Sequence, residues 1–493
     1  MGGVGALMLL WVWAPSVDAA GPAQATFLLR ALWVQGGLTA ALFLWWWRSG
    51  ARREPPSLAL LLALLALTRC LVSPLPPVFS EDLWRYLWDG GLQWLNAPTY
   101  LWAPSDPSFD QLLQDTPELA ALRGWIGHPT LPTIYPPGAQ LLFRLSVAVE
   151  ISLRALRGAL FLGEALSLVA LYQLLEGKPR LRALLLPYTL SPFICFEGSN
   201  HLEPWGIAAL LWGFLWFKRG GALRAGVCLG LGVSIKLLPA LALACLFGAS
   251  ERWRARLWLI TGALIGALLV TLPFWSELPR FFSNLSHYGA HWRANDGVFA
   301  LLHQGVDAVI SSCIGERPWR PPEPLGALLR ALVDAADPGG RLWPDELRFS
   351  LTKLIAGLLW LITAGALSWE TLTRRARPPV ERAGLLFYRL LFLLLLLSPV
   401  VHPWYLLWLC PCALWSWGLG AKSAPLVALW SVTAPLAYHA RFAALAGEGW
   451  RELPLISALE YLPLIFCSLL LYRHQTSIMG ESHHSAGDGR CAG

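Results

Sequence analysis

The chain alternates between long apolar stretches and short polar segments, and this pattern predicts its architecture. A helix needs about 20 mostly apolar residues to cross a bilayer, so several stretches are expected to be tilted or only partly inserted. The stretch 222–250 carries Lys236 near its middle and predicts two short helices joined there. The other apolar stretches cover residues 3–20, 26–47, 56–73, 156–175, 181–196, 203–218, 257–275, 352–370, 384–399, 403–418, 423–438 and 454–472. We predict an all-α polytopic membrane protein with about 12–14 transmembrane helices.

The apolar stretches and the polar segments between them divide the chain into six parts. These are N-terminal transmembrane helices (1–73), a first long loop (74–155), a middle group of transmembrane helices (156–275), a second long loop (276–351), C-terminal transmembrane helices (352–474) and a polar tail that we expect to be disordered (475–493). Prolines in the first loop separate three expected helices, over 81–95, 107–123 and 138–153, which suit an interfacial position.

Basic residues predict the orientation of these parts. They gather in short loops between the apolar stretches: Arg48, Arg52, Arg53, Lys178, Arg180, Arg182, Lys218, Arg219, Arg224, Arg252, Arg254, Arg256, Arg374, Arg375, Arg377 and Arg382. The positive-inside rule places all of these loops, and with them the polar tail, in the cytoplasm. Both long loops are then extracytoplasmic, although loops of that length are weak indicators of orientation by themselves.

Composition agrees with a membrane protein. Hydrophobic residues make up 56% of the chain and charged residues 14%, whereas soluble domains carry about 25% charged residues. The net charge of +7 arises from the short basic loops, so we expect the lipid bilayer and no nucleic acid as a partner. The nine cysteines form no CxxC pair, and we interpret them as small core residues.

The run from Ser80 to Gly90 is the first candidate for chemistry. Asp82, Arg85, Tyr86 and Asp89 follow i, i+3, i+4, i+7 spacing and therefore share one face of a helix. A desolvated carboxylate at a membrane surface can act as a general base. An ordinary amphipathic interfacial helix is the simpler interpretation of the same pattern.

Lys236 is a second candidate, because ionisable groups at membrane depth are often functional. It could hold a lipid phosphate as a point charge, or it could be a lysine whose ammonium reaches the interface. Gly226 and Gly230 form a small-xxx-small pattern beside it, which predicts close helix packing.

Three further clusters combine polar and aromatic residues. Glu197, Asn200, His201 and Glu203 could hydrogen-bond sugar hydroxyls or cap the helix that starts near residue 204. The turn His402–Tyr405 includes a histidine that the turn itself does not require. The run 287–296, which contains Trp292, suits contact with a glycan and nearly equally an interfacial aromatic belt.

The chain carries no nucleotide-binding motif of the GxGxxG or Walker A type, no HExxH zinc motif and no GxSxG serine-hydrolase motif. The run Ser80–Gly90, the segment Asn96–Tyr100 and the segment His128–Pro137 together resemble bacterial membrane glycosyltransferases of the C-type (GT-C) fold. More narrowly, they are similar to the polyprenyl-phosphate-mannose-using branch, known as family 87 or DUF2029-like. The runs Glu197–His201, Lys236–Pro239 and Ser398–Tyr405 follow in the same order, so the resemblance covers residues 56–472.

The resemblance implies an inverting transfer of a hexose, mannose in this branch, from a polyprenyl-phosphate donor to a glycan or lipid-linked acceptor. The site would face the extracytoplasmic side of a bacterial inner membrane. The family usually carries Asp-Asp at the start of its first outer loop, where this chain has Glu81 and Asp82. Asp82 is therefore expected as the general base, with Glu81 assisting it. Glu81 is a departure from the family pattern that keeps the charge on a longer arm.

The remaining roles follow from the same resemblance and from charge. Lys236, Arg85 and His402 are expected at the donor phosphate. Sugar or acceptor contacts are expected from Asp89, Tyr86, Glu197, Asn200, His201, Tyr135, Trp292 and Tyr405. We expect no cofactor and no metal site, because departure of a phosphate does not by itself require a metal. The acidic pair nevertheless keeps Mg²⁺ or Mn²⁺ as an alternative.

A transporter or flippase of lipid-linked glycans is the main alternative. A transporter of this kind would have the same size, intramembrane lysine and polar clusters as the glycosyltransferase. Two features disfavour it: the chain shows no matched halves with paired broken helices, and the carboxylates gather on one face. The sequence leaves open the acceptor, the linkage, the oligomeric state, and whether mannose, glucose or arabinose is moved.

Overall fold

A computed structural model describes residues 54–75, 77, 79–313, 344–373, 375–421, 423–445 and 449–468, together with isolated positions near residues 30–41 and 327–331. Over these ranges the secondary structure is helical, apart from one isolated bridge between Ala294 and Val400. The predicted apolar span 3–20 and the tail 475–493 lie outside the described residues, as does most of the predicted span 26–47. The expectation of an all-α membrane protein agrees with the described part of the chain.

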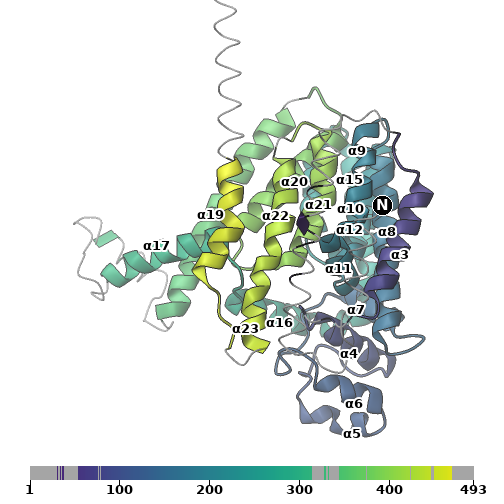
Figure 1. The fold of residues 1–493 in the computed structure, drawn as a ribbon, viewed down its shortest axis with the longest axis vertical. Helices are drawn as coiled ribbons and strands as arrows, with labels where there is room; N and C mark the ends of the chain where they lie inside the picture. Colours follow the sequence, from purple (N-terminus) through teal and green to yellow (C-terminus); the bar gives the residue numbers. More distant parts are fainter. Residues whose placement is uncertain are drawn as a thin grey trace, which may run out of the picture.

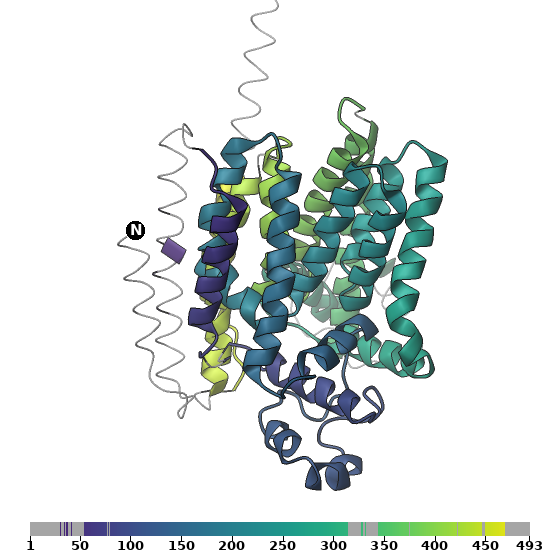
Figure 2. The same ribbon diagram turned by 90° about the vertical axis from the view of Figure 1, so that its right-hand side faces the viewer.

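The helices form an upright bundle with a group of shorter helices at one end (Figures 1 and 2). The bundle contains α3 (Leu58–Val72), α8 (Leu153–Leu174), α9 (Pro179–Ala183), α10 (Leu185–Thr189), α11 (Pro192–Asn200), α12 (Glu203–Lys218), α13 (Ala222–Ile235), α14 (Pro239–Ala249), α15 (Trp253–Thr271), α19 (Pro344–Thr373), α20 (Pro379–Leu397), α21 (Leu406–Trp417), α22 (Ala424–Thr433) and a helix over Pro454–Ser468. The other elements are α4 (Asp82–Trp94), η1 (Pro107–Phe109), α5 (Asp110–Gln114), α6 (Pro117–Arg123), α7 (Pro137–Ser146), η2 (Leu272–Glu277), α16 (Leu278–His291), α17 (Gly297–Cys313), η3 (Pro403–Tyr405), η4 (Ala434–Tyr438) and α23 (His439–Leu445).

Three stretches among the described residues are long and apolar enough to cross a membrane, judged by length and composition. They are Leu153–Leu174, Trp253–His291 and Asp345–Thr373. Four shorter apolar helices, of 10–17 residues, accompany them. The expected total of about 12–14 transmembrane helices stays a prediction.

Prolines decide where several helices begin and end. The stretch 222–250 forms α13 and α14 with Lys236 between them, as predicted. The stretch 181–196, predicted as one span, is instead divided among α9, α10 and α11, because Pro187 and Pro192 lack the amide protons that a continuous helix needs. The third loop helix ends at Ser146 and not at residue 153, and α8 begins at Leu153. The second long loop, 276–351, contains helices α16 and α17.

Glycines allow α13 and α15 to pack backbone against backbone. A Cβ atom at Gly226 would lie 2.1 Å from the carbonyl oxygen of Leu259, and one at Gly230 would lie 2.1 Å from that of Ala263. On the facing helix, a Cβ at Gly262 would meet the carbonyl oxygen of Leu223 at 2.1 Å. The predicted small-xxx-small packing is thus confirmed, and it fixes the helix that leads into Lys236.

The first loop has its own core at one end of the bundle. Buried side chains of α4, such as Leu83 and Trp88, pack on residues of α6 and α7 and on Leu156 and Leu160 of α8. Figure 2 shows α4–α6 below the bundle, whereas α9 lies at the opposite end in Figure 1. Because α9 carries Arg180 and Arg182, the loop helices and this basic segment lie at opposite ends of the molecule.

Candidate active site

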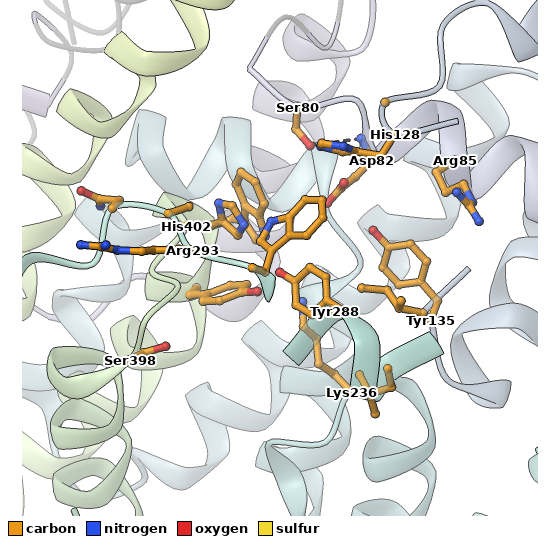
Figure 3. A pocket seen from close by; sticks show the side chains of 18 of the residues that line it. Ser80, Asp82, Arg85, His128, Tyr135, Lys236, Tyr288, Arg293, Ser398 and His402 are labelled. Carbon is orange, nitrogen blue, oxygen red and sulfur yellow. Dashed lines mark hydrogen bonds between the residues drawn. The ribbon is translucent and has the colours of Figure 1, made fainter. Parts of the chain in front are cut away.

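A cavity of about 1160 Å³ lies where the loop helices meet the bundle. Its wall combines the start of α4, the segment 127–136, the break between α13 and α14, part of α16, the segment 292–295, the segment 398–405 and residues near α23. Figure 3 shows Asp82, Tyr135, Lys236, Tyr288 and His402 around this space. Segments from nearly the whole described chain therefore converge on one cavity.

Asp82 occupies the first turn of α4, where the helix dipole favours a carboxylate. Ser80 Oγ accepts a hydrogen bond from the Asp82 amide at 3.1 Å, which fixes the start of the helix. The Tyr86 hydroxyl lies 3.5 Å from Asp82 Oδ2, and Tyr135 also hydrogen-bonds to this carboxylate. Burial raises the pKa of Asp82, while the positive charges of His201 and Lys236 act in the opposite direction. A raised pKa brings the group closer to the range that suits a general base.

Asp89 organises the segment that faces Asp82. Its carboxylate is 1% exposed and accepts hydrogen bonds from Arg85 Nε at 3.0 Å and Thr133 Oγ1 at 2.6 Å. Gln140 donates a third hydrogen bond at 3.0 Å. Arg85 in turn donates to the carbonyl of Leu131 at 3.0 Å. This network holds the segment 131–136 against α4 and engages much of the Arg85 guanidinium.

Lys236 reaches the cavity because the chain leaves helical geometry there, with φ −154° and ψ 142°. Its ammonium pairs with the carboxylate of Glu203, which is fully buried at the start of α12. The same ammonium lies 5.0 Å from the centre of the Tyr405 ring, in cation–π range. Its side chain is 26% exposed, so the cation is accessible to an anion in the cavity.

Three rings stack in the wall behind Lys236. The Trp404 indole lies between the imidazoles of His201, with ring centroids 4.1 Å apart, and His402, at 4.3 Å. Burial, together with the nearby positive charges of Lys236 and His201, lowers the pKa of His402 to about 3. His402 is therefore neutral near pH 7 and can offer one N–H donor to a ligand.

The opposite end of the stack faces carboxylates. Burial alone would lower the pKa of His201, but the carboxylates of Glu197, which lies 3.2 Å from Nδ1, Glu203 and Asp82 together raise it. Tyr438 donates a hydrogen bond to Glu197. Asn200 lies nearby and accepts a hydrogen bond from Arg157 at 2.6 Å. Arg157 also donates to the carbonyls of Ser73 and Leu75, and so fixes the chain that leads into α4.

The Glu81 side chain is held at the cavity rim by an ion pair and by packing against a glycine. Arg441 of α23 lies 2.6 Å from its carboxylate, in a half-exposed ion pair. Gly127 packs directly against the same side chain, because a Cβ there would lie 1.9 Å from Glu81 Oε2. Glu81 therefore links α4 to α23 and to the segment that starts at residue 127.

Eight of the predicted site residues line the cavity and five do not. The cavity residues are Glu81, Asp82, Arg85, Tyr135, Lys236, Trp292, His402 and Tyr405. Tyr86, Asp89, Glu197, Asn200 and His201 are buried behind its wall, where they contact the cavity residues or their neighbours. The roles assigned to all thirteen stay predictions.

The fold also brings to this place residues and contacts that no local pattern predicted. Glu203 was a candidate for binding sugar hydroxyls or capping a helix, but its pairing with Lys236, 33 positions away, was not predicted. Arg441, Tyr288 and His128 also contribute to the cavity wall. Within the described ranges no group of three or more His, Cys, Asp or Glu side chains is placed to hold a metal ion, and the expectation about metals stays a prediction.

Comparison with known protein families gives a match in the C-terminal part of the chain. Residues 344–459 match the family model described as the MptB C-terminal domain. This stretch runs from α19 into the helix that begins at Pro454 and contributes His402, Trp404 and Arg441 to the site. No curated protein and no solved structure matches the chain.

Proposed function

We propose that this protein is a membrane glycosyltransferase of the C-type fold that moves a hexose from a polyprenyl-phosphate donor to a glycan or lipid-linked acceptor. Mannose is the proposed sugar, and the extracytoplasmic face of a bacterial inner membrane is the proposed location of the site. The match of residues 344–459 supports this assignment, since MptB is a mannosyltransferase. The resemblance of residues 56–472 to the same class of enzymes also supports it.

The observation that carries the proposal is the placement of Asp82 and Lys236 in one cavity. In the proposed reaction the Asp82 carboxylate accepts the proton of an acceptor hydroxyl while that oxygen forms a bond to the anomeric carbon. The bond between the anomeric carbon and the phosphate oxygen breaks, and its electron pair stays on the phosphate. Lys236 stabilises this developing charge. The products are the glycosylated acceptor and polyprenyl phosphate.

The composition of the cavity wall supports a lipid-linked donor. Leu238 just before α14, Leu241 of α14, and Leu394 and Leu395 of α20 line it beside Lys236. An isoprenoid chain gains about 25 cal/mol for each Å² of apolar surface that it buries on such side chains. A phosphate at Lys236 with its lipid along α14 and α20 would leave the sugar near Asp82.

The decisive experiment compares Asp82→Asn with wild-type protein purified in detergent, using polyprenyl-phosphate mannose as donor and octyl mannoside as acceptor probe. We expect a loss of transfer of about 10²–10⁴-fold, because the general base is removed. Asp115→Asn is the matched control, since Asp115 is exposed in the same loop. Full transfer by Asp82→Asn would refute the mechanism. A wild-type protein that moves the donor across vesicles without transferring sugar would favour the flippase alternative.

A further inference from the structure

His128 has an unusual backbone for a residue at the rim of the cavity. Its φ angle is 54°, in the left-handed region that non-glycine residues seldom adopt. Its carbonyl accepts a hydrogen bond from the Leu131 amide at 3.0 Å, which closes a turn. Glycine would occupy this position at lower conformational cost. The turn therefore explains a left-handed residue here but does not explain an imidazole.

The imidazole lies in the same cavity as Asp82. His128 is an exposed residue that lines this cavity, and Figure 3 draws it on the side of Asp82 opposite Lys236. Its ring meets Trp292 edge to face, with centroids 4.6 Å apart. The preceding Gly127 packs on Glu81, so the turn is tied to the residue next to Asp82. The position of the ring is thus set from two sides.

Two sides of Asp82 differ in chemistry. Lys236, with the apolar side chains of α14 and α20 beyond it, suits the phosphate and lipid of a donor. In an inverting transfer the acceptor approaches the anomeric carbon opposite the leaving group. The side of Asp82 away from Lys236 therefore suits the acceptor. Figure 3 draws His128 on that side, and the His128 ring contacts the Trp292 indole. An aromatic face with an adjacent hydrogen-bonding nitrogen matches the C–H face and hydroxyl groups of a sugar.

We propose that His128 is an acceptor-binding residue, which hydrogen-bonds a hydroxyl of an acceptor sugar held against Trp292. This contact would orient the attacking oxygen toward Asp82. The inference rests on the proposed function, and it adds the side of the cavity from which the acceptor binds. Positive φ values at non-glycine residues gather at ligand-binding sites, where function compensates for their conformational cost.

The test is His128→Gly in the full-length protein, with the same donor and octyl mannoside as acceptor probe. We expect the acceptor KM to rise about tenfold, the donor KM to change by less than about twofold, and the slow hydrolysis of donor by water to persist. Thermal stability should be unchanged or higher, because glycine relieves the left-handed backbone. Asn96→Gly is the matched control: its φ is 56°, its side chain is exposed, and it does not line the cavity.

Two further results would separate the interpretations. His128→Asn keeps a hydrogen-bonding side chain that tolerates this backbone, and it should recover part of the acceptor affinity. An unchanged acceptor KM in His128→Gly, with active wild-type protein, would overturn the role of His128 and leave the proposed function intact. A rise in donor KM without a rise in acceptor KM would also overturn it. Wild-type protein without transferase activity would instead remove the proposed function itself.

Discussion

Replacement of Lys236 by methionine should destabilise the protein by leaving a buried charge without its partner. Glu203 is fully buried, and its Oε2 has no hydrogen-bond partner among the described residues, while Oε1 pairs with Lys236. Loss of one partner from a buried ion pair costs about 3–5 kcal/mol. Because the Lys236 side chain is 26% exposed, we expect the low end of that range, about 3 kcal/mol.

The double variant Lys236→Met/Glu203→Gln tests this reasoning. It removes both charges and leaves a neutral buried amide, which costs about 1–2 kcal/mol. The double variant should therefore be more stable than the single variant. Lys218→Met is the surface control, since Lys218 is exposed at the end of α12, and it should change stability by less than about 0.5 kcal/mol.

Thermal unfolding in detergent micelles and transfer assays on the same samples would report stability and activity separately. Both variants should lose about 10²–10³-fold in transfer, because neither retains the cation for the leaving phosphate. Recovery of stability without recovery of activity would distinguish the two roles of Lys236. The reasoning is refuted if the single variant is as stable as wild type, or if the double variant is no more stable than the single.

Three further predictions concern other parts of the structure. Burial raises the pKa of Asp82, and the carboxylate form is the base. We therefore expect kcat/KM to rise with pH, with an apparent pKa above the ordinary aspartate value of about 3.9. A pH profile that is flat down to about pH 4 would contradict this. Gly230→Ala should lower the melting temperature, because the new Cβ atom would lie 2.1 Å from a carbonyl oxygen. Gly158→Ala should leave the melting temperature unchanged or raise it, because the space around Gly158 is open. Arg441→Met should lower the free energy of unfolding by less than about 1 kcal/mol, because the ion pair of Arg441 with Glu81 is partly exposed. A loss above about 3 kcal/mol would show that this ion pair contributes to stability as a buried pair does.

Local patterns were sufficient to predict most helices. The spacing of apolar residues gave α12 and the α13–α14 pair, and it gave α4 with one polar face. Where prediction failed, as over residues 181–196, prolines divided an apolar stretch that a hydropathy pattern treats as continuous. Helix position is thus largely a local property, set by apolar periodicity and by residues that cannot donate a backbone hydrogen bond.

Local sequence patterns predicted only part of the candidate site. Asp82 and Lys236 stand out because charges are rare in this chain, and Tyr135 lies in the motif that carries the resemblance. Whether a side chain lines the cavity or lies behind its wall depends on packing between distant elements. Asp89 shares the helical face of Asp82, yet Thr133 and Gln140 enclose it.

The sequence by itself determined that this is a helical membrane protein with charges confined to a few places, because the bilayer imposes that pattern on every segment separately. Only the tertiary structure decided which of those charges meet. Glu203 pairs with Lys236, Arg441 pairs with Glu81, and His128 contacts Trp292 in the cavity that Asp82 also lines, each through contacts between segments far apart in the chain. Such pairings depend on how helices cross and where their ends meet, and no local pattern of residues encodes that geometry.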